Sequence, residues 1–177
     1  TFTITPDEGY HVTDVLVDGS SVGAFESYTF NDVVANHTLT ATFEINTYEI
    51  TVTQGAHGVI APAGTTSVQH GSDRTFTITP DEGYHVTDIL VDGTSVGAFE
   101  SYTFNDVDAN HTLTAAFAIN TYDISVTQGT HGLIEPTGIT TVEHGNDVTY
   151  TITPDEGYYV LDVEIDGESV GSMESYT

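Results

Sequence analysis

The sequence predicts an all-β chain of tandem small antiparallel β-domains, β-sandwich or β-grasp-like and without a substantial helix, arranged as beads in a stiff rod. The first observation behind this class is a repeat of 74 residues, because residues 1–74 and 75–148 are identical at 58 of 74 positions. A fixed period of near-identical copies is typical of an array that reuses one folded unit. The second observation is the alternation of apolar and polar residues, with no segment that shows a helical period.

The one complete copy, residues 47–120, contains short apolar segments separated by turn residues. Most segments alternate apolar and polar positions, which is typical of half-buried strands. The strands predicted in chain order are 48–53, 59–62, 66–68, 75–79, 84–91, 101–104 and 112–119. Glycines supply the early turns, Pro80 ends the strand at 75–79, and Asp92-Gly93 is a two-residue hairpin signal.

Differences between the copies indicate which positions are buried, because a packed core accepts apolar exchanges but no unpartnered carboxylate. The positions that exchange apolar residues are Val15, Ile89 and Val163; Val17, Val91 and Ile165; and Phe2, Phe76 and Tyr150. The positions that gain a carboxylate, and are predicted to be exposed, are Leu90 (Glu164), Val34 (Asp108) and Ala61 (Glu135). The apolar face of the strand that begins at Tyr10 slips by one residue at Thr13-Asp14, which predicts a β-bulge.

The predicted domains follow the repeat. Residues 1–46 form the C-terminal part of one repeat, residues 47–120 a complete repeat, and residues 121–177 the N-terminal part of a third. The alternation changes phase at Asn46-Thr47 and at Asn120-Thr121, so about two residues separate consecutive domains. We expect the chain to be a window on a longer array.

Charge restricts the partners. The chain has 27 acidic residues and a single base, Arg74, for a formal net charge of −26 at pH 7. Nucleic acids and anionic membranes need a basic surface, so both are excluded, and cations from outside are expected to match part of the charge. No run of 18 apolar residues is present, so this segment is not expected to insert directly into a membrane. There is no cysteine to form a disulfide or a thiolate metal site.

A set of concerted motifs in the complete copy resembles the divergent internalin-B-type B-repeat family. The motifs are Tyr48-x-Ile50-x-Val52, Gly55-x-x-Gly58, Pro62-x-Gly64, His70-Gly71, Phe76-x-Ile78-x-Pro80-x-x-Gly83-Tyr84, Val91-Asp92-Gly93, Tyr102-x-Phe104-x-x-Val107-x-Ala109-Asn110-His111-Thr112 and Ala116-x-Ala118. The resemblance implies a β-rich module of secreted and surface proteins of bacteria and archaea, which serves mostly as a stalk or spacer and sometimes in adhesins. It implies no catalytic residues.

Acidic residues near the turn after Pro80 raise the question of calcium, because calcium prefers clustered oxygen ligands. The spacing of a known calcium loop is absent, so no metal site is assigned and no cofactor is predicted. The candidates for calcium are Asp81, Glu82 and Asp88, with their equivalents Asp7, Glu8 and Asp14, and Asp155, Glu156 and Asp162.

Two further groups of residues are candidates for a site. Asn36-His37-Thr38 and Asn110-His111-Thr112 are N-glycosylation sequons, which makes Asn36 and Asn110 candidate acceptors. The eight histidines show neither metal-ligand spacing nor the order of a catalytic triad, so no enzyme activity is predicted.

Copies this similar cannot each hold a different role, so they predict a function that depends on repetition, such as length, reach or multivalency. The first hypothesis is a structural region of an extracellular or cell-surface stalk or fibre of a bacterium or archaeon, acting as spacer or filament subunit and associating with like chains. The alternative is a multivalent adhesin-type module, with weak binding of a glycan or surface by each repeat, and with calcium as a possible requirement. A binder should keep an exposed cluster in every copy, whereas a spacer needs only its core and junctions.

Overall fold

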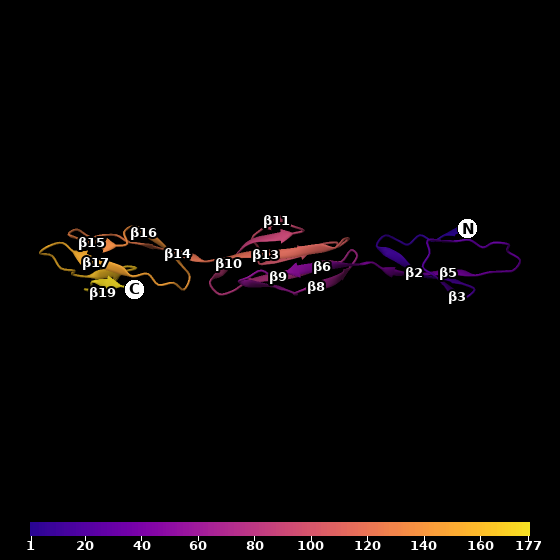
Figure 1. The fold of residues 1–177 in the computed structure, drawn as a ribbon, viewed down its shortest axis with the longest axis horizontal. Helices are drawn as coiled ribbons and strands as arrows, with labels where there is room; N and C mark the ends of the chain where they lie inside the picture. Colours follow the sequence, from indigo (N-terminus) through magenta and orange to yellow (C-terminus); the bar gives the residue numbers. More distant parts are fainter. The chain divides into compact units, whose positions relative to one another are not determined.

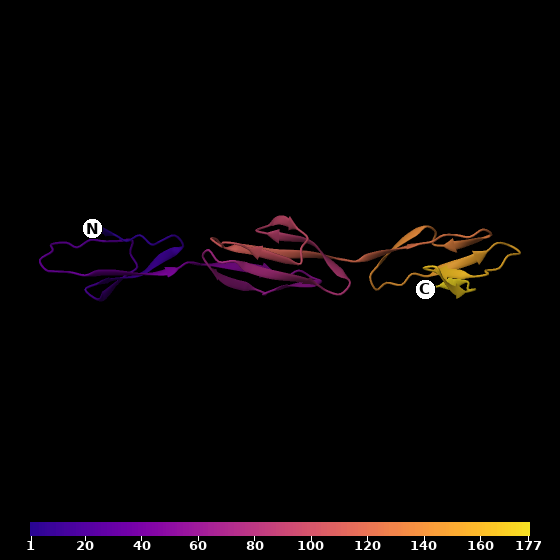
Figure 2. The same cartoon turned by 180° about the vertical axis from the view of Figure 1, so that it is seen from behind.

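The computed structural model describes all residues, 1–177, and contains only strands and loops (Figures 1 and 2). The predicted all-β class is confirmed. No helix that could span a membrane is present. The strands are β1 (Phe2–Thr3), β2 (Tyr10–Val17), β3 (Ser20–Gly23), β4 (Ser27–Tyr28), β5 (Leu39–Ile45), β6 (Thr47–Thr53), β7 (Gly58–Ala61), β8 (Thr65–Gln69), β9 (Arg74–Pro80), β10 (Tyr84–Val91), β11 (Thr94–Gly97), β12 (Ser101–Phe104), β13 (His111–Ile119), β14 (Thr121–Ser125), β15 (Gly132–Glu135), β16 (Ile139–Glu143), β17 (Tyr150–Pro154), β18 (Val163–Ile165), β19 (Glu168–Gly171) and β20 (Ser175–Tyr176).

The chain groups into two compact units. The first unit consists of Thr1–Asp81 and Val86–Phe117, and the second of Glu82–His85 and Ala118–Thr177. Glu82–His85, which belong by sequence to the complete repeat, therefore group with the residues that follow it.

The complete repeat is a β-sandwich of two sheets. One sheet has the order β11-β10-β13-β6-β8 and the other the order β12-β9-β7. A single apolar cluster draws side chains from both sheets, which is how two sheets bury their apolar faces. Its members are Ile50, Val52, Ile60, Val68, Phe76, Ile78, Ile89, Phe104, Val107, Leu113 and Ala115.

One pairing in this sandwich departs from the antiparallel expectation. β6 and β13, the first and last strands of the repeat, pair in parallel, with Ile50 opposite His111 and Val52 opposite Leu113. The repeat also contains antiparallel ladders: β6 with β8, β9 with β7, β12 with β9 and β10 with β11. Parallel first and last strands let the chain enter the repeat at one end and leave it at the other.

Each strand predicted in the complete repeat is found, with ends that agree within one residue. β11 had no predicted range, although the turn at Asp92-Gly93 implies a returning strand. The predicted bulge is confirmed as a register shift between Val12 and Asp14 in the ladder of β2 with β5.

Burial mostly follows the comparison of the copies. Val15, Ile89 and Phe76 are fully buried and Val34 is 95% exposed, as predicted. Phe2 is an exception, because it is 57% exposed although its equivalent Phe76 lies in the core. The reason is that β1 pairs only with β4, whereas β9 pairs with both β12 and β7.

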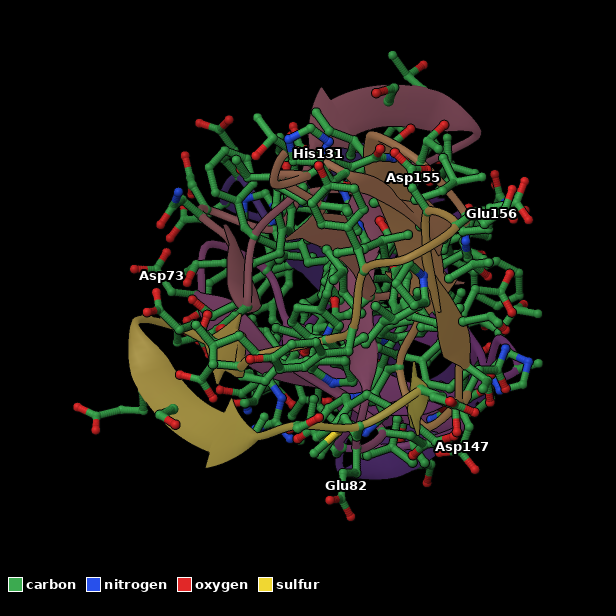
Figure 3. The ribbon with its side chains drawn as sticks, turned by 90° about the vertical axis from the view of Figure 1, so that its left-hand side faces the viewer. Asp73, Glu82, His131, Asp147, Asp155 and Glu156 are labelled. Atoms are coloured by element: carbon green, nitrogen blue, oxygen red, sulfur yellow. The ribbon has the colours of Figure 1, made fainter.

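Acidic side chains stay at the surface. Asp73, Glu82 and Asp147 are exposed and point outward in Figure 3. No charged residue is buried in the chain. The negative charge is therefore carried by solvated carboxylates, not by a buried ionic network.

Candidate functional site at the junctions between repeats

The junction between repeats consists of a single residue outside the strands. β5 ends at Ile45 and β6 begins at Thr47, which leaves Asn46 between them. Asn120 takes the same place between β13 and β14. The sequence pattern predicted about two residues here, and the structure shows an even tighter connection.

Two β-ladders meet at Asn46. In the antiparallel ladder of β2 with β5, Tyr10 lies opposite Ile45, and the next step places Gly9 opposite Asn46. The N–H of Asn46 accordingly donates to the carbonyl of Gly9, at 2.7 Å. In the ladder of β6 with β8, Thr47 lies opposite Gln69, and the N–H of His70 donates to the carbonyl of Asn46, at 2.8 Å. Asn46 thus continues one ladder from each of two successive repeats.

The Asn46 side chain adds a third hydrogen bond. Its Oδ1 lies 2.9 Å from Nδ1 of His11, which can donate to the oxygen only as the Nδ1–H form. A neutral hydrogen bond of this kind contributes about 0.5–1.5 kcal/mol net. Main chain and side chain together therefore fix both neighbours of the junction.

Gly9 is required by two features of the junction. Its φ is 77°, in the left-handed region where a side chain is strained. In addition, the ring of His70 occupies the space where a Cβ on Gly9 would lie. The His70 ring also lies 6.0 Å from the ring of Tyr48, centroid to centroid. Only glycine lets the turn before β2 reach the histidine of the following repeat.

The same arrangement recurs around Asn120. Its N–H donates to Gly83 at 2.7 Å, its carbonyl accepts from His144 at 2.8 Å, and its Oδ1 lies 2.8 Å from Nδ1 of His85. The ring of His144 covers Gly83 as the ring of His70 covers Gly9. We call this arrangement the junction latch, formed by Gly9, His11, Asn46 and His70 and by Gly83, His85, Asn120 and His144.

The amino-acid sequence alone does not reveal the latch. Identity of these residues between copies was a possible signal, but most positions are identical between the first two copies and identity alone does not single them out. The third copy keeps Gly157 but has Tyr159 in place of the first histidine, and Tyr159 is 79% exposed. The structure therefore shows the latch at two junctions.

A second recurrent contact joins the Asp-Gly hairpin turn to the last strand. His111 Nδ1 lies 2.7 Å from the Asp92 carboxylate, and the Thr112 N–H donates to the same carboxylate at 2.7 Å. The hydrogen bond from His111 is the main cause that lowers the pKa of Asp92 below its ordinary value. In the first copy, the hydrogen bond from His37 lowers the pKa of Asp18 in the same way.

The calcium candidates lie mostly in structural contacts or alone in solvent. Asp88 accepts hydrogen bonds from Ser95 Oγ at 2.7 Å and from the Gly97 N–H at 3.2 Å, which hold the hairpin of β10 and β11. Asp14 and Asp162 make the equivalent bonds in their copies. The remaining candidates are exposed near their turns: Asp7, Glu8, Asp81, Glu82, Asp155 and Glu156. No group of three or more acidic or histidine side chains is arranged to hold a metal ion.

Both glycosylation candidates are exposed. Oδ1 of Asn110 accepts a hydrogen bond from the Glu49 N–H, at 2.8 Å, just before the parallel ladder of β6 with β13 begins. Asn36 is exposed in the equivalent loop of the first copy.

The second unit contains a cavity of about 640 Å³. Its lining includes Gln128, Ile134, Ile152 and Leu161. In the complete repeat, the space between the corresponding strands is filled by β13. The cavity therefore corresponds to the place of a strand and is not assigned a ligand.

The sandwich fold and the latch define a class: a tandem array of small structural β-domains joined directly through their ladders. The family model described as "Divergent InlB B-repeat domain" matches residues 48–121 and 122–175. The chain belongs to this divergent InlB B-repeat family, whose repeats occur in bacterial surface proteins and are structural domains. No curated protein and no solved structure matches the chain.

Proposed function

We propose that this chain is the structural repeat region of an extracellular or cell-surface stalk or fibre of a bacterium or archaeon, in which each repeat acts as a spacer. The observation that carries this proposal is the junction latch. Asn46 belongs to the ladders of two successive repeats, so no flexible linker separates them. A spacer needs this property, because its reach depends on how firmly each repeat holds the next.

The near-identity of the copies supports the same function. A spacer gains reach with every added repeat, and each added copy needs only the same core and the same latch. The residues of the first latch are identical to those of the second. The family is composed of structural repeats, which agrees with this role.

The test is a series of arrays with increasing numbers of copies of residues 47–120. Small-angle scattering and negative-stain imaging measure the maximum dimension of each array. We expect this dimension to grow by a constant increment with each copy. A series that collapses into globules of nearly constant diameter would overturn the spacer function.

Exposed phenylalanines favour a second candidate, a multivalent adhesin-type module for a glycan or surface. Phe25 is 51% exposed and Phe99 is 56% exposed, at equivalent positions of two copies, and Met173 keeps the third copy apolar. Weak contacts of this kind gain strength by repetition. If this function holds, Phe25→Ser with Phe99→Ser abolishes retention on a glycan array, whereas Val34→Ser has no effect, because the second copy has Asp108 at that exposed position. Absence of any retention by the unmodified chain leaves the spacer as the function.

Self-association of like chains belongs to the proposed fibre. β7 and β12 are the edge strands of the three-stranded sheet in the complete repeat. Edge strands carry unpaired main-chain groups that can pair with another chain. Cations between neighbouring chains would offset the repulsion between their carboxylates.

A further inference from the structure

The two sequons of this chain differ at one position that matters for glycosylation. Both read Asn-His-Thr, but the residue two positions before the asparagine is Asp108 in the complete copy and Val34 in the first. A transferase whose peptide-binding groove carries a cationic group opposite that position discriminates between the two sequons, because the cation pairs with the Asp108 carboxylate and has no partner in Val34. The chain therefore carries an acceptor that satisfies such an enzyme beside a nearly identical one that does not.

The fold leaves the reactive atom of Asn110 available. Asn110 is exposed, and its Oδ1 accepts the hydrogen bond from the Glu49 N–H at 2.8 Å. An asparagine amide has two donors on its nitrogen, and Nδ2 of Asn110 makes no hydrogen bond in the structure. A sugar on Nδ2 leaves the carbonyl oxygen free to keep its bond to Glu49. The glycosylated side chain thus fits the folded repeat without the loss of a hydrogen bond.

The loop before Asn110 presents the acidic residue as well. Val107 anchors the loop, because its side chain is 1% exposed, its N–H donates to Ser72 and its carbonyl accepts from Gly71. Asp108, the next residue, is exposed and makes no hydrogen bond or ion pair. Its carboxylate and the Asn110 side chain are therefore both exposed, two residues apart.

We propose that Asn110 is an N-glycosylation acceptor for transferases that require an acidic residue two positions upstream, and that Asn36 is not. The co-reactant is a lipid-diphosphate-linked oligosaccharide. A bond forms between Nδ2 and the anomeric carbon, and the bond from that carbon to the diphosphate oxygen breaks with its electron pair leaving on the diphosphate. Nδ2 loses one proton, which passes to the released diphosphate or to solvent. No oxidation or reduction occurs. The inference rests on the proposed extracellular location.

The structure also determines when the transfer occurs. His111 and Thr112 belong to β13, the central strand of the five-stranded sheet. The N–H and hydroxyl of Thr112 are held by the Asp92 carboxylate at 2.7 Å and 3.3 Å. A transferase that reads the threonine hydroxyl must bind this segment before β13 joins the sheet. Transfer therefore precedes folding of the repeat, during or just after export.

The experiment uses the whole 177-residue chain, exported into the periplasm of a bacterial host that contains such a transferase and its lipid-linked oligosaccharide. The host exports the chain, so the result does not depend on whether the chain is extracellular in its own organism. A C-terminal reporter sequon shows that the transferase reached each sample. The chain is digested at acidic residues, and mass spectrometry measures glycan occupancy at each asparagine. We expect a glycan on Asn110 and none on Asn36.

Two exchanges between the copies provide matched variants. Each introduces a residue that the other copy already carries, so the fold should accept both. We expect Val34→Asp to add a glycan at Asn36 and Asp108→Val to remove the glycan from Asn110. An unmodified Asn110 beside a modified reporter overturns the proposal, and so does equal occupancy of Asn36 and Asn110 in the unmodified chain.

A second measurement tests the timing. Purified folded chain and urea-unfolded chain, diluted into the assay, are offered to the same transferase with the same lipid-linked oligosaccharide. We expect faster transfer to Asn110 in the unfolded chain, and equal rates at the reporter sequon in both samples. Equal rates at Asn110 would show that β13 does not shield the sequon and would overturn transfer before folding.

Discussion

At the scale of single residues, glycine and histidine determine the junction. Gly9 and Gly19 both adopt a positive φ, of 77° and 78°, but only Gly9 lies beneath a ring, that of His70. Nothing lies within 4 Å of a Cβ built on Gly19. Substitutions at these two glycines therefore distinguish the effect of backbone strain, which both share, from the effect of the contact with His70, which only Gly9 makes.

Gly9→Ala is predicted to open the latch, and Gly19→Ala to leave it closed. Each alanine is strained by about 1–2 kcal/mol at positive φ. Gly9→Ala adds overlap with His70, so we expect it to lower stability by about 1–3 kcal/mol more than Gly19→Ala. Hydrogen exchange checks this locally: the Asn46 and His70 amides should lose protection in Gly9→Ala and keep it in Gly19→Ala. Equal protection in both variants would contradict the latch.

At the scale of strands and turns, the pair of Asp92 and His111 couples the hairpin of β10 and β11 to β13. The pKa of Asp92 is lower in the folded chain than its ordinary value of 3.8, chiefly through the hydrogen bond from His111. A carboxyl with a lowered pKa stabilises the fold at pH values above its unfolded pKa. That stabilisation is lost as the pH falls from about 3.8 through the lower folded pKa.

We therefore predict that Asp92→Asn reduces the acid dependence of stability. Its melting temperature should fall below that of the unmodified chain at pH 6, and the two should converge as the pH approaches 2.5. Asp73→Asn is the matched control, since Asp73 is exposed and accepts its hydrogen bond from the main-chain N–H of Asp106, not from a histidine. A constant difference in melting temperature between Asp92→Asn and the unmodified chain from pH 6 to pH 2.5 would refute the coupling.

The sequence predicted the strands of the complete repeat well, because alternation reports directly which face of a strand is buried. It did not predict which strands pair. The parallel ladder of β6 with β13 joins Ile50 to His111, and nothing in either segment's pattern specifies its partner. The latch is not predictable for a related reason: Gly9 and His70 lie far apart in sequence and meet only after two ladders have formed. The calcium candidate Asp88 makes hydrogen bonds to Ser95 and Gly97, and these depend on a hairpin geometry that its neighbours in sequence do not reveal.

At the scale of the whole molecule, charge opposes folding and association alike. The net charge is −26, and the ion pairs of His37 with Asp18 and of His111 with Asp92 engage only two of the 27 acidic residues. Arg74, the single strong base, has a buried Nε without a hydrogen-bond partner and lies 6.0 Å from the Phe76 ring centre. The remaining carboxylates repel one another through solvent, and that repulsion falls when salt reduces the screening length to about 10 Å at 0.1 M.

We predict that the melting temperature at pH 7 rises by several degrees between low salt and molar sodium chloride, because screening weakens repulsion in the compact state more than in the expanded one.

Calcium chloride at matched ionic strength distinguishes general screening from bound ions. Specific calcium sites would raise the melting temperature further at millimolar calcium, and a chelator would reverse that increase. An effect equal to that of sodium would assign the acidity to a diffuse cation layer, as the solvated carboxylates favour. A melting temperature that changes with neither salt would show that hydration alone already relieves the repulsion between carboxylates. The proposed role of cations between neighbouring chains would then have no support.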